Sequence, residues 1–199
     1  MILPSSLVVT WRARSEAPAS LDQVQELLHT WVSRRALDDI LVDVADYRHV
    51  PQGPGLFVIG HHANYQLRVD QDTWEFSCQQ KARTEGDPDP LRSVFERSVL
   101  ACHRLETDLK AKGLFDPTRV RIGSYDRRFW DLTERPLSVL SASIEARLGP
   151  LLLSAPRLEI VTGGAAPALA VSWTAPRSFD ELTQRIAELA STRSEALRA

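Results

Sequence analysis

Three of the five histidines, His49, His61 and His62, lie within one stretch of the chain, residues 40–70. Histidine is the side chain best suited to proton transfer near neutral pH. The loop sequence PQGPG follows directly after Val50 and forces a turn, and functional residues concentrate on such loops. His49 and His62 are therefore candidate general bases, although turn chemistry alone also accounts for the loop next to His49.

The residues from 57 to 69 alternate between apolar and polar, which predicts one continuous strand with a core face and a half-polar face. Neighbouring strand side chains point to opposite faces, so His61 and His62 are not expected to chelate one metal as a simple pair. His61 falls in the apolar row, which predicts a buried histidine with hydrogen-bonded ring nitrogens. His62 shares its row with Asn64 and Gln66, where it either lines a polar groove or faces water.

A second group of polar residues ends a later predicted strand, residues 119–125. Arg121 lies on the polar face of that strand, and Asp126 and Arg127 follow at its end. An acid and guanidinium groups there could bind an anionic ligand, although a local surface ion pair is a common alternative. We take Asn64, Arg121 and Arg127 as candidate ligand-binding residues, and Asp126 as a candidate catalytic partner of a histidine.

The strings HVPQGPGLFVIGHHANYQLRVD, at 49–70, and RVRIGSYDRRF, at 119–129, resemble a family of uncharacterised bacterial proteins. Members of that family share an HVP-x-GPG stretch, a strand, a GH-x-A-x-Y stretch, and a later strand that ends in an Asp-Arg pair. The resemblance covers about the middle half of the chain. An acidic residue often follows the Gly-His pair in that family, where this chain has His62. The resemblance implies a bacterial protein and supplies no activity.

Composition is that of an ordinary globular protein, with 43% hydrophobic and 25% charged residues. The 24 basic residues are spread among 26 acidic ones and the net charge is −2, which disfavours nucleic acid as a main partner. No apolar run reaches the roughly 18 residues needed to span a bilayer. With no signal-peptide pattern, we expect a cytoplasmic protein without a membrane partner. Cys78 and Cys102 lie in apolar rows and are expected to be reduced core thiols.

Periodicity along the chain predicts the element order β-α-β-β-β-α-β-α-β-β-α. Ser20 with Gln23 forms a predicted capping box, and Asp89 precedes a strongly amphipathic helix. The first part of this order is similar to a ferredoxin-like βαββαβ fold with an added hairpin strand. We predict a single α+β domain over residues 1–199, with a mostly antiparallel sheet and helices on one face, which leaves an open face or a lateral cleft for partners.

The common catalytic signatures are absent from the sequence, which has no GxSxG, HExxH, CxxC, GxGxxG or P-loop pattern. The sequence therefore predicts no metal site and no cofactor. The favoured hypothesis is a non-catalytic module that binds a small ligand, a protein partner or a second copy of itself. The alternative is a hydrolase or isomerase with His49 or His62 as general base. In it Asp46 or Asp126 would orient the base, and Arg127 would hold an anionic substrate.

Overall fold

The computed structural model describes residues 6–14, 16–51, 53–70, 73–81, 87–124, 137–162 and 168–196, with side chains as far as residue 192. In these residues the elements follow in the order β1 (Leu7–Arg12), α1 (Leu21–Arg34), β2 (Leu41–Tyr47), β3 (Gly55–Gly60), β4 (Ala63–Asp70), β5 (Thr73–Gln80), α2 (Pro90–Asp108), β6 (Arg119–Ser124), α3 (Leu137–Leu152), β7 (Arg157–Val161), β8 (Ala168–Ser172) and α4 (Phe179–Ala196). The order matches the predicted one except for one additional strand.

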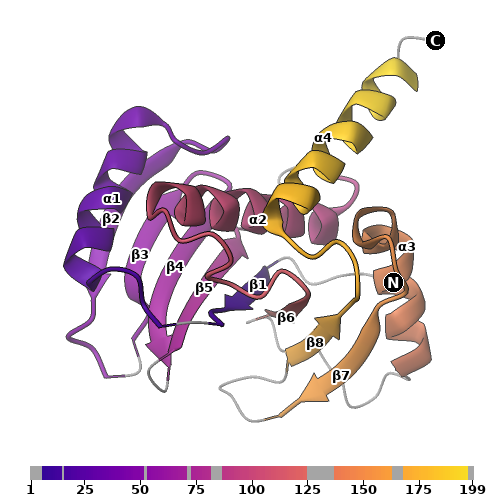
Figure 1. Ribbon diagram of the computed structural model, residues 1–199, viewed down its shortest axis with the longest axis horizontal. Coiled ribbons are helices and arrows are strands. Elements are labelled where there is room, and N and C mark those ends of the chain that lie inside the picture. Colours follow the sequence, from indigo (N-terminus) through magenta and orange to yellow (C-terminus); the bar gives the residue numbers. More distant parts are fainter. Residues whose placement is uncertain are drawn as a thin grey trace.

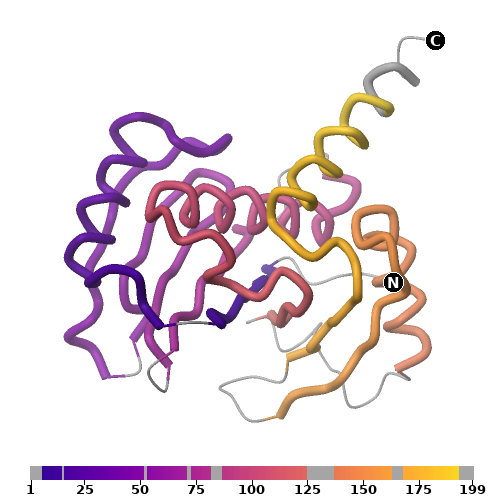
Figure 2. Tube along the Cα trace, in the orientation of Figure 1, coloured from indigo at the N-terminus to yellow at the C-terminus, as the bar shows by residue number. Residues whose placement is uncertain are grey.

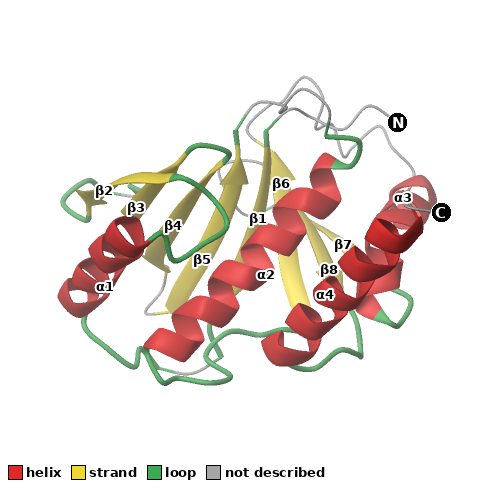
Figure 3. Cartoon of the chain, turned by 90° about the horizontal axis from the view of Figure 1, so that it is seen from above, coloured by secondary structure: helices red, strands yellow, loops and turns green. Residues whose placement is uncertain are grey.

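The strands form one eight-stranded sheet in the order β2-β3-β4-β5-β1-β6-β8-β7, with antiparallel neighbours throughout. Strands β4, β5, β1 and β6, together with α1 and α2, make the ferredoxin-like βαββαβ arrangement. Strands β2 and β3 extend one edge of this unit, and β8 and β7 extend the other. Helices α1 and α2 lie on one face of the sheet (Figures 1 and 3), which confirms the predicted α+β class and one-sided helical layer.

Local signals in the sequence account for where the helices begin. The Ser20 hydroxyl accepts a hydrogen bond from the Gln23 backbone N–H, and the Gln23 side chain accepts one from the Ser20 N–H, so the predicted capping box is confirmed. The Asp89 carboxylate caps α2 by accepting from the Arg92 N–H. Helix α4 packs on α2 near its start and then runs away from the sheet (Figure 2).

None of the described helices combines the length and apolar character that a membrane crossing needs.

Trp11 lies at the centre of the core between the sheet and the helices. Its side chain is fully buried, and its indole N–H donates to the Ser98 hydroxyl of α2 at 3.0 Å. Its ring also contacts those of Phe95, Trp173 and Phe179, with centroids 5.0 to 6.0 Å apart. Tilted and edge-on aromatic contacts of this kind add to the stabilisation from burial alone. One side chain of β1 thus holds α2, the segment after β8 and the start of α4 together.

The prediction of one continuous strand over 57–69 is wrong. The structure has two strands, β3 and β4, which pair through Ile59 and Asn64 and turn at His61 and His62. The turn shifts the alternation by one residue, so that Ile59 points away from the helices. His61 is exposed and His62 is half-buried, and the predicted buried position of His61 is also wrong.

A carboxylate from a distant part of the chain stabilises this turn. Asp39, whose side chain is fully buried, accepts hydrogen bonds from the backbone N–H groups of His62 at 3.1 Å and Ala63 at 3.0 Å. A Cβ atom at Gly60 would lie 2.3 Å from the Ala63 carbonyl oxygen, so only glycine fits there. The turn carries no Asn-Gly or Asp-Gly pair, and Asp39 supplies the hydrogen bonds that fix it instead.

Replacing Asp39 by alanine should lower the free energy of unfolding by about 2 kcal/mol, because two backbone N–H groups lose a charged acceptor. Urea denaturation followed by circular dichroism measures the change. The neighbouring Asp38→Ala variant is the control, since that side chain is exposed and should change stability by less than about 0.5 kcal/mol. Equal stabilities of the two variants would contradict the role assigned to Asp39.

Candidate functional site

The face of the sheet turned away from α1 and α2 carries charged side chains at its centre. They are Arg12 of β1, Glu75 of β5, and Arg119 and Arg121 of β6, each one strand position away from a residue that is buried under the helices. Helices α1, α2 and α4 all lie on the opposite side of the sheet (Figure 1), so in the described part of the chain none of them covers this face. The sheet therefore presents arginine side chains to solvent opposite its apolar core.

A change of strand register opens a pocket in this face. Strands β1 and β6 pair as far as Thr10 and Arg121, and the two chain segments meet again at a bridge between Ala13 and Phe115. Two residues, 11 and 12, lie between these points on one side, and five residues, 116–120, lie between them on the other. The longer segment cannot stay in the ladder, and a pocket of about 350 Å³ lies beside it.

We call this cavity the arginine pocket, because four of its ten lining residues are arginines. The others are a threonine, an aspartate, two alanines and two valines. The lining residues are Thr10, Arg12, Ala13, Arg14, Asp116, Arg119, Val120, Arg121, Val161 and Ala170.

Asp116 fixes the longer segment and one of the arginines. Its Oδ1 atom accepts hydrogen bonds from the Thr118 backbone N–H at 2.9 Å, the Thr118 hydroxyl at 2.7 Å and the Arg14 guanidinium at 2.5 Å. Partial burial works against ionisation, but the hydrogen bonds from Thr118 and Arg14 outweigh it and hold the pKa of Asp116 below its usual value. Asp116 is therefore an ionised structural carboxylate at neutral pH.

Glu75 holds another arginine of the pocket in place. Its side chain is fully buried in the polar face, where Oε2 accepts from Nε and Nη2 of Arg68 at 3.0 and 2.7 Å, and Oε1 accepts from Nη2 of Arg121. These bonds run from β4 through β5 to β6 and pass over β1. A guanidinium has five N–H donors, so the bond to Glu75 leaves most donors of Arg121 for other partners.

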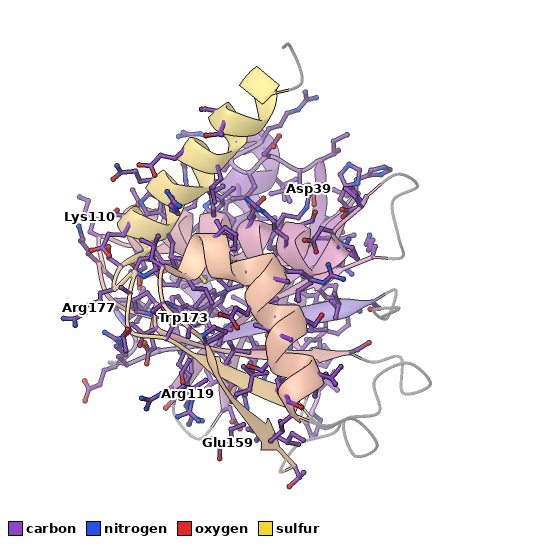
Figure 4. All side chains as sticks on the ribbon, turned by 90° about the vertical axis from the view of Figure 1, so that its right-hand side faces the viewer. Asp39, Lys110, Arg119, Glu159, Trp173 and Arg177 are labelled. Atoms are coloured by element: carbon purple, nitrogen blue, oxygen red, sulfur yellow. The ribbon has the colours of Figure 1, made fainter. Side chains whose placement is uncertain are left out.

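The pocket and its ion pairs carry an excess of positive charge. Five arginines, at 12, 14, 68, 119 and 121, are balanced by the three carboxylates at 75, 116 and 159, which leaves a local charge of +2. Arg119 and Glu159 lie on the side of the sheet away from α2 (Figure 4), and their contact is long, at 3.5 Å. The whole chain has a net charge of −2, so the pocket is locally cationic on an acidic protein.

The candidate ligand-binding residues from the sequence lie in different places. Arg121 is in the wall of the arginine pocket. Asn64 lies on the same face of the sheet but on β4, with β5 and β1 between it and the pocket wall on β6. Its side-chain oxygen is buried and has no hydrogen-bond partner among the described residues. Arg127 and Asp126 lie outside the described residues.

The candidate histidines lie far along the sheet from the pocket, at the β3 and β4 end. The rings of His61 and His62 touch, with centroids 4.6 Å apart, and in the described residues neither ring has a carboxylate within hydrogen-bond distance. His49 is exposed in the turn after β2. The Asp46 carboxylate binds the Arg48 side chain and backbone N–H, which lower the pKa of Asp46 to about 2. Asp46 is thus hydrogen-bonded to an arginine, and His49 acts on it only as a weaker nearby charge.

The two cysteines are free and buried in the core, and burial raises the pKa of both thiols. Within the ranges that the structure describes, no three His, Cys, Asp or Glu side chains are grouped so that they could hold a metal ion. The chemistry that the arginine pocket itself offers is recognition of negative charge by guanidinium groups.

The sequence interpretation missed Arg12, Arg14 and Arg119, although a signal was present. Both segments that meet at the pocket contain an Arg-x-Arg triplet, WRAR at 11–14 and RVR at 119–121. In a strand this spacing puts both arginines of a triplet on one face.

Comparison of the chain with known protein families, with curated proteins and with solved structures finds no match. The resemblance to uncharacterised bacterial proteins therefore stays a prediction.

Replacing Glu75 by glutamine should lower the free energy of unfolding by about 1–2 kcal/mol, because two guanidiniums lose a buried charged acceptor while remaining partly open to water. Guanidinium chloride denaturation measures this change in the free energy of unfolding. The control is Glu159→Gln, which removes a long, exposed ion pair and should cost less than about 0.5 kcal/mol. If Glu75→Gln left the free energy of unfolding unchanged, the ion pairs of Glu75 would not stabilise the fold.

The lowered pKa of Asp116 gives a pH dependence of known sign. Its folded pKa lies below the reference value of 3.8, so its contribution to stability is present above that pH and is lost as pH falls through the folded pKa. We expect the melting temperature of Asp116→Asn to fall below that of the wild type at pH 7, and the difference to shrink toward pH 3. Asp38→Asn, at an exposed site, should show little difference at either pH. A difference for Asp116→Asn that grows toward low pH would overturn the assignment.

Proposed function

We propose that this protein is a non-catalytic binding module that holds a small anionic ligand in the arginine pocket. The observation that carries the proposal is that four arginines, Arg12, Arg14, Arg119 and Arg121, line one cavity of about 350 Å³. That volume is within the range of small-molecule sites. Arginine matches carboxylate and phosphate groups with paired N–H donors, so such a cavity favours an anionic occupant.

The pocket lining supports binding rather than the alternative of a hydrolase or isomerase. A general base must lie within hydrogen-bond reach, directly or through one water, of the proton that it removes. The only carboxylate in the described lining, Asp116, is already bonded to Arg14 and Thr118. The Thr10 hydroxyl is 2.9 Å from the Ser77 hydroxyl and is likewise engaged. The lining thus offers charge recognition without a free base.

The same face gives little support to a nucleic acid partner. Single-stranded RNA binds open sheets of this kind by stacking its bases on aromatic side chains of the central strands. The central strands β1 and β5 present Val8, Thr10, Ser77 and Gln79 on this face instead. Together with the acidic net charge, these residues favour a small ligand.

Assembly through the sheet edge has weaker support than ligand binding. Ile40 and Val42 at the edge strand β2 are exposed, at 64% and 61%, which would favour a partner there. However, the register of β2 shifts between Leu41 and Asp43, and the Asp43 carboxylate accepts from the Val44 N–H. Bulges and charged side chains of this kind oppose strand addition at an edge.

Titration with small anions at low salt tests the proposal, with isothermal calorimetry and a panel of phosphate, sulfate, citrate and benzoate. At least one anion should bind the wild type, and Arg119→Gln should weaken it about tenfold, because one charge-assisted contact is lost. Arg34→Gln is the matched control, since this exposed arginine ends α1 on the helical side. The proposal fails if no anion binds, or if both variants weaken binding equally.

A further inference from the structure

We propose that the ligand of the arginine pocket is an organic phosphate monoester with a small apolar group. This inference rests on the proposed function, and it names the class of anion that the pocket selects. Three features carry it: the number of guanidinium donors, the local charge and the apolar part of the wall.

The number of donors exceeds what a carboxylate uses. One guanidinium satisfies the two oxygens of a carboxylate through a bidentate pair of hydrogen bonds. In the described residues, Asp116 and Glu75 each occupy one terminal nitrogen, of Arg14 and Arg121, and Arg12 has no carboxylate within 4.0 Å. The pocket thus keeps unused N–H donors on several guanidiniums. The three terminal oxygens of a phosphate monoester accept from several guanidiniums at once.

The local charge of +2 matches a dianion. A phosphate monoester carries about −1.5 to −2 charge at pH 7. A phosphate diester or a monocarboxylate carries only one negative charge and would leave the pocket cationic. The charge of the pocket and its ion pairs therefore favours the monoester over both.

The apolar part of the wall favours an organic ester over inorganic phosphate. Val161 and Ala170 line the pocket beside the arginines, and Ala170 pairs directly with Arg121 across the strands. Inorganic phosphate would leave this apolar surface in contact with water, whereas a hydrocarbon or aromatic group on the ester oxygen would cover it.

Calorimetry at pH 7.5 and low salt tests the inference with phenyl phosphate as the probe. The comparison ligands are methyl phenyl phosphate, which is a monoanion, benzoate, succinate and inorganic phosphate. Phenyl phosphate should bind at least about tenfold more tightly than each of them, a difference of about 1.4 kcal/mol. Arg12→Gln should weaken phenyl phosphate about tenfold, whereas Arg34→Gln should leave it unchanged.

Filling the apolar part of the pocket tests the organic group separately. Ala170→Leu should weaken phenyl phosphate by a larger factor than inorganic phosphate. Ala170 is nearly buried, so Val161→Phe, at a half-buried site of the lining, is a second variant, and thermal melting checks that each is folded. An equal loss for both ligands in the folded variants would overturn the role of the apolar wall.

The outcomes separate this inference from the proposed function. Succinate or benzoate binding as tightly as phenyl phosphate would overturn the phosphate class and leave an anion-binding pocket. Inorganic phosphate binding as tightly would overturn the organic group. Phenyl phosphate binding that Arg12→Gln leaves intact would place the site elsewhere and overturn the inference. Failure of every anion to bind would overturn the proposed function as well.

Discussion

The fold and the site both depend on the central strand β1, which is hydrogen-bonded to β5 on one side and to β6 on the other. Strand alternation sends Trp11 into the aromatic cluster under α2 and sends Arg12 to the opposite face. The packing that fixes the strand therefore also fixes the direction of the pocket arginine. A single constraint, the period of two in one strand, connects the apolar core with the charged pocket.

Much of the fold could be predicted from the sequence because its signals are local. Helix starts at Ser20 and Asp89 follow from side chains within three residues of the caps, and most strands follow from alternation. The turn between β3 and β4 could not be predicted in this way. Its stabilising group, Asp39, lies 23 residues before His62 in the chain, and the alternation on both sides of the turn looks like one strand.

The pocket was only partly accessible to sequence reasoning. Arg121 was a candidate because its strand and face could be predicted, and the Arg-x-Arg spacing could have added Arg12, Arg14 and Arg119. Local sequence patterns do not reveal which strands pair, because strand pairing joins segments that lie far apart in the chain. The register change between Thr10 and Ala13, which opens the pocket, and the link from Glu75 to Arg121 are both of this kind.

The segment 116–120 shapes the pocket but does not take part in the pairing of β1 with β6. It lies outside the β1 and β6 ladder, and Asp116 ties it to Arg14 and Thr118 through side-chain contacts at its start. Changing the length of such a connection costs little in chain entropy, since the loop-closure free energy grows only with the logarithm of loop length. Insertions between Pro117 and Thr118 would reshape the rim of the cavity while the eight strands keep their partners. Related sequences could thus diverge in what they bind while sharing one scaffold.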